Sequence, residues 1–304
     1  MEFNPGVGQE LSTLVCTFAQ PLAMRLSKRI IVALFRLTRT WNLLILVFAQ
    51  YFTAWFLLKA HIFTDWRLLM LTASSALIAA GGYVINDYYD VKIDLVNNPN
   101  RVVVGRSVPR RFAILLHGLL SMAGIALGIF LSWWIVAINI FSVSLLWFYS
   151  NLLKRLPFVG NLAVALLTGT SIAVLNVLYY QSNLLVIIYA VFAFFMTLIR
   201  EVIKDMEDLK GDNTFGCKTL PIVWGIRKTK SFIYGMVAVF AAAVLFINQV
   251  YVKLPLIYFL MMLFVPLAWL VMQLVKADTK RDFSWLSSFC KVIMLLGILS
   301  MALV

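Results

Sequence analysis

Long apolar runs separated by short polar segments dominate the sequence. Each run is close to the roughly 20 residues that an α-helix needs to cross a bilayer. The runs are 41–58, 68–86, 112–131, 133–149, 159–179, 184–200, 231–250, 254–275 and 288–304. The pattern predicts an all-α integral membrane protein, in which nine transmembrane helices form one bundle around a central cavity.

The composition supports this prediction. Hydrophobic residues make up 62% of the chain, charged residues 13%, and the mean hydropathy is +0.93. Soluble domains average about 25% charged residues, so this class is excluded. No linker divides the apolar runs, and we expect a single transmembrane domain at 28–304. Residues 1–27 are expected to form a disordered or interfacial tail, within which Met24 is a second reasonable start.

The basic residues predict the orientation in the membrane. The chain has 26 Lys and Arg against 13 Asp and Glu. If the N-terminus is cytoplasmic, all basic residues except Lys59, Arg67 and Lys253 fall on the cytoplasmic side, as the positive-inside rule requires. We therefore expect a bacterial or archaeal inner-membrane protein that contacts anionic lipids, and no binding of nucleic acid.

Two acidic arrays share one spacing, D-x-x-D-x-x-x-D, and their corresponding residues lie 118 positions apart. The first comprises Asp87, Asp90 and Asp94, and the second Asp205, Asp208 and Asp212. If each helix continues beyond its apolar run, positions i, i+3 and i+7 lie on one helix face. The arrays follow the second and the sixth apolar run, both even-numbered, so both emerge on the same side of the membrane. We therefore expect them to face each other across the cytoplasmic mouth of the cavity.

Such arrays need a cation. Carboxylates on successive turns repel one another, and near a helix C-terminus they also oppose the helix dipole. Mg²⁺ prefers oxygen ligands and commonly links one or two carboxylates to substrate phosphates. The sequence therefore predicts a Mg²⁺-bound diphosphate between the arrays. The expected metal ligands are Asn86 and the six aspartates, and the six aspartates also form the expected catalytic set.

Two other interpretations remain open at this stage. The acids could be solvated loop charges that pair with Lys92, Lys204, Lys210 or Arg101. They could also bind the transported ion of a cation transporter, because transporters are often built from repeats. The arrays lie at span ends and among basic residues, which favours an anion held through metal.

The cysteines and histidines add no further site. Cys16, Cys217 and Cys290 form no close pair and no metal-ligand spacing. His61 falls in a loop, and we expect His117, inside a span, to be a packing residue.

The motifs resemble those of the UbiA-type intramembrane prenyltransferases, which have nine transmembrane helices and two aspartate-rich motifs. Asn86-Asp87-x-x-Asp90-x-x-x-Asp94 is similar to the first motif, and the array that begins at Asp205 to the second. The segment 149–155 resembles the family's tyrosine-lysine-arginine segment. Arg39-x-x-Asn42 resembles a further element, although Thr40 replaces the usual proline.

The resemblance implies Mg²⁺-dependent transfer of a prenyl group from an isoprenyl diphosphate donor to a lipophilic acceptor. The substrate-binding residues that we expect are Asn42, Asn86, Arg101, Tyr149, Lys154, Arg155 and Lys204. Four of these residues also have a plainer explanation. Lys154 and Arg155 could be basic residues that only anchor the cytoplasmic side, and Tyr149 could be an aromatic residue at the membrane interface. Asn42 could be a buried amide that bonds to backbone.

The segments 200–212 and 217–221 look most like the branch that makes digeranylgeranylglyceryl phosphate, whose acceptor is geranylgeranylglycerol phosphate. The sequence at 102–106, VVVGR, departs from that branch's usual proline-x-proline-serine-glycine. An aromatic acceptor of the 4-hydroxybenzoate, naphthoate or chlorophyllide type is therefore the alternative within the enzyme class.

Overall fold

The computed structural model describes residues 30–252 and 260–303, and the regular elements in this part of the chain are all helices, without a strand. The long helices are α2 (Thr40–Phe56), α3 (Trp66–Asn97), α4 (Arg110–Ile129), α5 (Trp133–Asn151), α6 (Val159–Leu178), α7 (Leu184–Glu207), α9 (Leu220–Ile247), α11 (Val265–Lys276) and α12 (Lys280–Ser300). Shorter elements are α8 (Leu209–Thr214), the 3₁₀ turns η1 (Pro99–Arg101), η2 (Leu153–Arg155) and η5 (Met301–Leu303), and the π-helical segments η3 (Asn248–Val252) and η4 (Leu260–Phe264).

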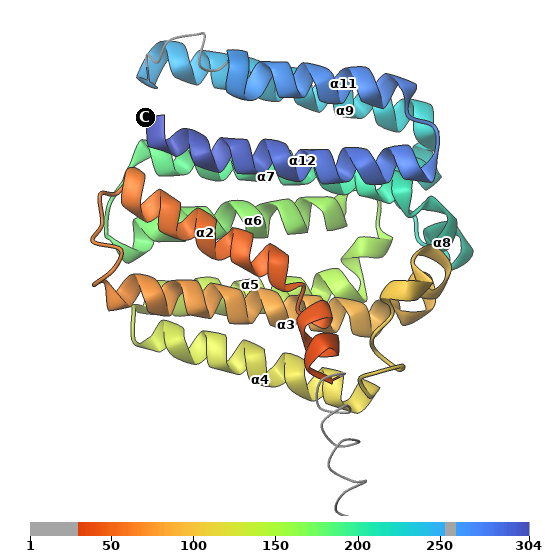
Figure 1. Ribbon diagram of the computed structural model, residues 1–304, viewed down its shortest axis with the longest axis horizontal. Coiled ribbons are helices and arrows are strands. Elements are labelled where there is room, and N and C mark those ends of the chain that lie inside the picture. The colour runs from red at the N-terminus through yellow and green to blue at the C-terminus, as the bar shows by residue number, and fades with distance from the viewer. Residues whose placement is uncertain (1–29, 253–259, 304) are drawn as a thin grey trace, which may run out of the picture.

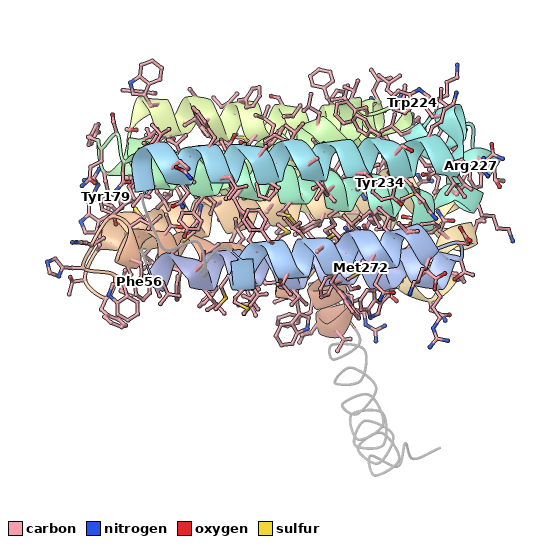
Figure 2. The ribbon with its side chains drawn as sticks, turned by 90° about the horizontal axis from the view of Figure 1, so that it is seen from above. Phe56, Tyr179, Trp224, Arg227, Tyr234 and Met272 are labelled. Atoms are coloured by element: carbon pink, nitrogen blue, oxygen red, sulfur yellow. The ribbon has the colours of Figure 1, made fainter. Side chains whose placement is uncertain are left out.

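The long helices lie side by side in one bundle (Figure 1). Helices α9 and α11 form one side, α7 and α12 lie next to them, and α4 lies at the opposite side beyond α3 and α5. Trp224 and Arg227, near the start of α9, lie at one end of the bundle, and Phe56 and Tyr179 lie at the other (Figure 2). The short helix α8 and the last turns of α3 share the Trp224 end, which we call the acidic end.

The helices have the length and surface of membrane spans. Within the described residues, seven helices are long and apolar enough to cross a bilayer, or eight if the bent pair Ile30–Leu37 and Thr40–Phe56 is one span. Large apolar side chains such as Trp41 and Trp133 remain about 80% exposed on the outside, as expected for a lipid-facing surface. The expected span 254–275 is only partly described, and therefore the count of nine stays a prediction.

The helix positions agree closely with the apolar runs, but several helices extend further at the acidic end. Helix α9 begins at Leu220 instead of 231, and α12 at Lys280 instead of 288. Hydropathy detects only the apolar part of a helix, whereas these first turns carry basic residues outside the apolar stretch. The expected tail, residues 1–27, lies outside the described residues.

Small residues let α3 approach its neighbours. A Cβ on Gly82 would lie 2.8 Å from the side chain of Leu146 on α5, and one on Gly81 would lie 3.0 Å from Ser121 Oγ on α4. His117 on α4 contacts the carbonyl of Gly81 through Nδ1 at 3.0 Å, which fits its expected packing role. This close packing fixes the helix that carries the first acidic array.

Candidate active site

The first acidic array lies on one uninterrupted helix. Helix α3 continues through Asp87, Asp90 and Asp94 and ends at Asn97, as the spacing predicted. The side chains of Asp87 and Asp90 are only 15% and 12% exposed. The interpretation of the array as solvated loop charges is therefore wrong for these residues.

The second array does not form the continuous stripe that its spacing predicted. Helix α7 ends at Glu207, Asp208 is its C-cap, and Asp212 lies on α8. The side chain of Asn97, at the end of α3, bridges this break: its Nδ2 donates to the Asp208 carbonyl (3.0 Å), and its Oδ1 accepts from the Gly211 amide (2.8 Å). The Asp208 carbonyl also accepts from the Asp212 amide at 3.1 Å. The break is stabilised because Asn97 supplies an acceptor for the Gly211 amide and a second donor for this carbonyl.

The two arrays lie within electrostatic reach of each other. Burial raises the pKa of Asp212 to about 6, and the charges of Asp208 and, more weakly, Asp94 of the first array add to this rise. The bridge from Asn97 to α8 brings the arrays together, since it joins the end of α3 to the segment that carries Asp212. The prediction that the arrays face each other agrees with this arrangement.

Most of the aspartates have a basic or amide partner. The pairs are Arg39 Nη2 with Asp87 Oδ1 (2.8 Å), Lys154 with Asp90, Lys204 Nζ with Asp208 Oδ2 (3.9 Å), and Asn161 Nδ2 with Asp205 Oδ2 (2.9 Å). Burial is the main reason that the pKa of Lys154 falls to about 8. Basic and acidic side chains thus alternate in the site. This arrangement suits a charged ligand that is contacted by groups of both signs.

The donor set suits Mg²⁺, although the described residues contain no group of three His, Cys, Asp or Glu side chains close enough to hold a metal by themselves. Asn86 Oδ1 and Asp208 Oδ1 are buried, and neither finds a hydrogen-bond partner in this part of the chain. Unpaired buried oxygen atoms are costly, and a hard divalent cation is the ligand they favour. The residues therefore fit a Mg²⁺ ion that substrate phosphate oxygens would help to coordinate.

Arg39 reaches the first array from a break in the first span. Its backbone is left-handed (φ 50°, ψ 52°), and the axes on either side differ by 52°. Thr40, in the place of the expected proline, donates through Oγ1 to the Phe35 carbonyl at 3.0 Å. The Arg39 guanidinium also lies over the Tyr83 ring, 4.9 Å from its centroid. The break therefore positions a cation beside Asp87.

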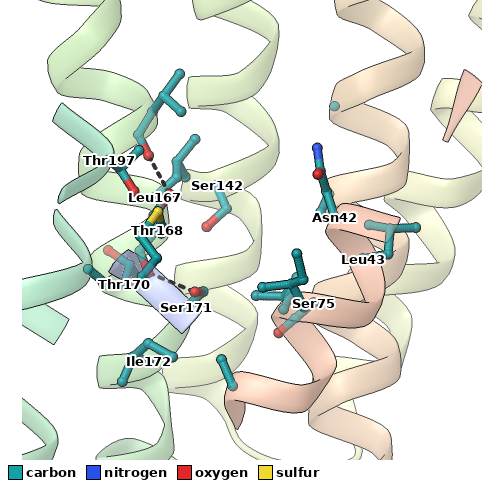
Figure 3. A pocket seen from close by; sticks show the side chains of 18 of the residues that line it. Asn42, Leu43, Ser75, Ser142, Leu167, Thr168, Thr170, Ser171, Ile172 and Thr197 are labelled. Atoms are coloured by element: carbon teal, nitrogen blue, oxygen red, sulfur yellow. Dashed lines mark hydrogen bonds between the residues drawn. The ribbon is translucent and has the colours of Figure 1, made fainter. Parts of the chain in front are cut away.

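A cavity of about 330 Å³ extends from this site into the bundle. Hydroxyl side chains on α6, including Thr168, Thr170 and Ser171, face Asn42 and Ser75 across it (Figure 3). Many of these hydroxyls are satisfied by their own helix, as for Thr168 Oγ1 with the Val164 carbonyl (3.0 Å). Most of the lining is apolar, so the cavity suits a hydrocarbon chain joined to a polar group.

The structure places the predicted substrate-binding residues in three settings. Asn42, Asn86, Tyr149 and Lys204 line the cavity. Lys154 lies outside the lining, in its ion pair with Asp90. Arg101 and Arg155 are exposed and do not line the cavity, so neither is placed to contact a ligand there.

Sequence reasoning missed several residues of this region. They are Asn97, Asn161, Arg200, Gly211 and Lys291. The signal available was a polar residue inside an apolar run, which marks Asn161 and Lys291 in particular. Asn97 and Gly211 carried no such signal, because their role depends on a contact between distant segments.

Comparison with known proteins gives a consistent result. The sequence model of the UbiA prenyltransferase family matches residues 29–298. The digeranylgeranylglyceryl phosphate synthase of Saccharolobus solfataricus is 32% identical over 253 residues, which cover 82% of this chain and 88% of that protein. The synthase of Pyrococcus abyssi is 40% identical over 162 residues, covering 53% and 58% of the two chains.

Solved structures agree in fold. A structure concerned with digeranylgeranylglyceryl phosphate synthase in membranes superposes with a TM-score of 0.67 at 23% identity, covering 90% of this chain and 98% of that one. A UbiA homologue from Archaeoglobus fulgidus, bound to DMAPP and Mg²⁺, gives 0.59 at 14% identity, with 89% and 99% covered. At these identities the likeness concerns the fold alone.

Proposed function

Because the chain belongs to the UbiA prenyltransferase family, we propose that it transfers a prenyl group from an isoprenyl diphosphate to geranylgeranylglycerol phosphate and releases diphosphate. The observation that carries this proposal is the pair of facing acidic arrays at the polar end of a mostly apolar cavity. The acceptor follows from the relatives, several of which are digeranylgeranylglyceryl phosphate synthases.

The acidic end would hold the diphosphate of the donor. Asn86 and the six aspartates would bind Mg²⁺, which supplies charge neutralisation for the leaving diphosphate when bound. Lys154 lies beside Asp90, and its ammonium is close enough to this array to contact a phosphate oxygen that the same array recruits. Tyr149 and Lys204 line the cavity and would contact the donor there. Arg101 and Arg155 would act only through the general positive potential at the mouth.

The apolar part of the cavity would hold the prenyl chain and exclude water. As the bond between C1 of the prenyl group and the diphosphate oxygen breaks, positive charge develops on the allylic carbon. Aromatic rings stabilise such charge by cation–π interaction, and Tyr83, Tyr149 and Phe192 line this cavity. The acceptor hydroxyl oxygen then forms the new bond to C1, and its proton is released.

The loop that departs from the expected branch motif does not argue for another acceptor. Val103, Val104 and Val108 are buried in a cluster with Leu37 and Val84, and no residue from 102 to 106 lines the cavity. The departure therefore changes packing beneath the bundle surface and leaves the lining unaltered. An aromatic acceptor remains the alternative that the experiment below must separate.

The placement in the membrane is part of the same proposal. The chain would form a single domain at 28–304 with nine spans, a cytoplasmic N-terminus and the acidic end at the cytoplasmic face of the cell membrane. The distribution of Lys and Arg supports this orientation. Labelling of single cysteines at Lys92 and at Phe63 with an impermeant reagent tests it, because only the position near Phe63 should react from outside.

Product analysis tests the proposed reaction. Purified protein in detergent receives geranylgeranyl diphosphate, Mg²⁺ and either geranylgeranylglycerol phosphate or 4-hydroxybenzoate. The proposal expects an ether product from the first acceptor and release of diphosphate that a chelator abolishes. If only the prenylated aromatic product formed, the acceptor would be the aromatic compound instead of geranylgeranylglycerol phosphate. Cation flux into liposomes without donor consumption would favour the transporter.

A further inference from the structure

Lys291 is a cation near the middle of a candidate membrane span. It lies eleven residues after the first residue of α12, Lys280, which is about 16 Å along the helix. It lines the cavity, and its Nζ donates a long hydrogen bond of 3.5 Å to Asn42 Oδ1. A lysine at this depth is costly unless it serves a polar cavity or finds a partner.

Within the described residues, Lys291 is the cavity-lining cation without a carboxylate partner. Arg39 pairs with Asp87, Lys204 with Asp208 and Arg200 with Glu201. No carboxylate oxygen in this part of the chain lies within 4.0 Å of Lys291 Nζ. The charged groups that face it are, in order of influence, Arg200, Lys204, Arg39 and Glu201. Because each of the other three cations has its own carboxylate partner, the unbalanced positive charge lies on Lys291.

This cation lies apart from the site assigned to the donor diphosphate. Arg200, its strongest neighbour, precedes Asp205 by five residues on α7, which places it about 7.5 Å further into the bundle. Lys291 and Asn42 come from α12 and α2, whereas Lys154 and Asp90 come from η2 and α3. The cavity therefore carries a second cationic group on another wall.

From this geometry we propose that Lys291, oriented by Asn42, binds the phosphate monoester of the lipophilic acceptor. The inference rests on the proposed function, because a phosphorylated acceptor supplies the anion. In geranylgeranylglycerol phosphate the free hydroxyl sits on the carbon next to the one that bears the phosphate. A phosphate held at Lys291 keeps that hydroxyl in the cavity that would hold the donor's prenyl chain.

Binding measurements without metal separate this site from the donor site. Purified wild type and Lys291→Met protein are titrated in EDTA with geranylgeranylglycerol phosphate and with geranylgeranylglycerol, which lacks the phosphate. Wild type should bind the phosphorylated lipid at least about tenfold more tightly, as a charge-assisted hydrogen bond supplies. Lys291→Met should lose this preference and keep the affinity for the phosphate-free lipid.

Matched variants control for charge and folding. Lys291→Arg keeps a cation and should keep most of the preference, whereas Lys276→Met removes an exposed lysine of α11 and should change nothing. With Mg²⁺ present, Lys291→Met should raise the KM for the phosphorylated acceptor about tenfold or more and leave the KM for the donor unchanged. Thermal unfolding of each variant verifies that it is folded.

The outcomes distinguish the two proposals. A Lys291→Met protein that keeps the phosphate preference, or that loses donor affinity instead, overturns the role of Lys291. A wild type without any phosphate preference overturns it as well. If wild type binds the phosphorylated lipid through Lys291 but forms no ether product, the anion site stands and the proposed reaction fails.

Discussion

Replacement of Asn97 with alanine should weaken the function of both acidic arrays although Asn97 carries no charge. The variant removes the hydrogen bonds to the Asp208 carbonyl and the Gly211 amide. Asn97 is 6% exposed and Gly211 is buried, so water replaces these bonds poorly. The Asp208 carbonyl also accepts from the Asp212 amide at 3.1 Å, so only the Gly211 amide is left unsatisfied, at a cost of about 1–3 kcal/mol.

This free energy acts on the docking of α8 against the end of α3. A loss of about 1–3 kcal/mol lowers the ratio of docked to undocked α8 by roughly 5- to 150-fold. Where α8 is undocked, Asp212 no longer faces Asp94, and ligand binding must restore the docked state. We expect the Mg²⁺ concentration for half-maximal transfer, and the donor KM, to rise by about tenfold or more.

A titration of prenyl transfer against Mg²⁺ and against donor measures this effect. Asn100→Ala is the matched control, because Asn100 is exposed in the same loop and should leave both values unchanged. Gly211→Ala tests the same contact from the other side, since an added Cβ would overlap the Asn97 side chain. In the Asn97→Ala/Gly211→Ala double variant that overlap disappears, so the two effects should not add. Wild-type Mg²⁺ and donor dependence in Asn97→Ala, or full additivity, would refute the reasoning.

Three further results are expected. Burial raises the pKa of Asp212 to about 6, so below that pH the metal must displace a proton. Mg²⁺ affinity should therefore rise from about pH 5 to 7, and the dependence of affinity on pH should be weaker in Asp212→Asn. Lys154→Met should raise the donor KM about tenfold or more, measured at fixed acceptor, and leave metal-free acceptor binding intact. Asn161→Ala removes the 2.9 Å hydrogen bond that orients Asp205, and should lower kcat about tenfold, whereas Asn161→Asp should lower it further through repulsion; equal rates in both would contradict this role.

The sequence predicted the features that depend on local pattern. Apolar runs located the helices, because crossing a bilayer requires a fixed length of helix. The spacing of Asp87, Asp90 and Asp94 predicted one shared face, and α3 continues through all three residues. Span parity predicted that both arrays share one end of the bundle, which agrees with the bridge between Asn97 and α8.

The features that the sequence did not predict depend on contacts between distant segments. The same spacing occurs at Asp205, yet the helix ends after Glu207, where Asn97 from another helix accepts from the Gly211 amide. The unpaired charge of Lys291 is likewise invisible in the sequence, because its neighbours along α12 say nothing about the carboxylates of α7. Periodicity identifies a helix face, and only tertiary packing identifies what that face meets.

The central claim is that both arrays act together on a diphosphate through Mg²⁺. The most direct test is the rate of diphosphate release from geranylgeranyl diphosphate by Asp90→Ala and Asp208→Ala, with Asp278→Ala as control, since the Asp278 side chain is 85% exposed and pairs with Lys230. The account predicts that each array variant loses about 10²–10³-fold in rate and that Asp278→Ala retains the wild-type rate. Near wild-type diphosphate release in either array variant, at saturating Mg²⁺ and acceptor, would contradict it.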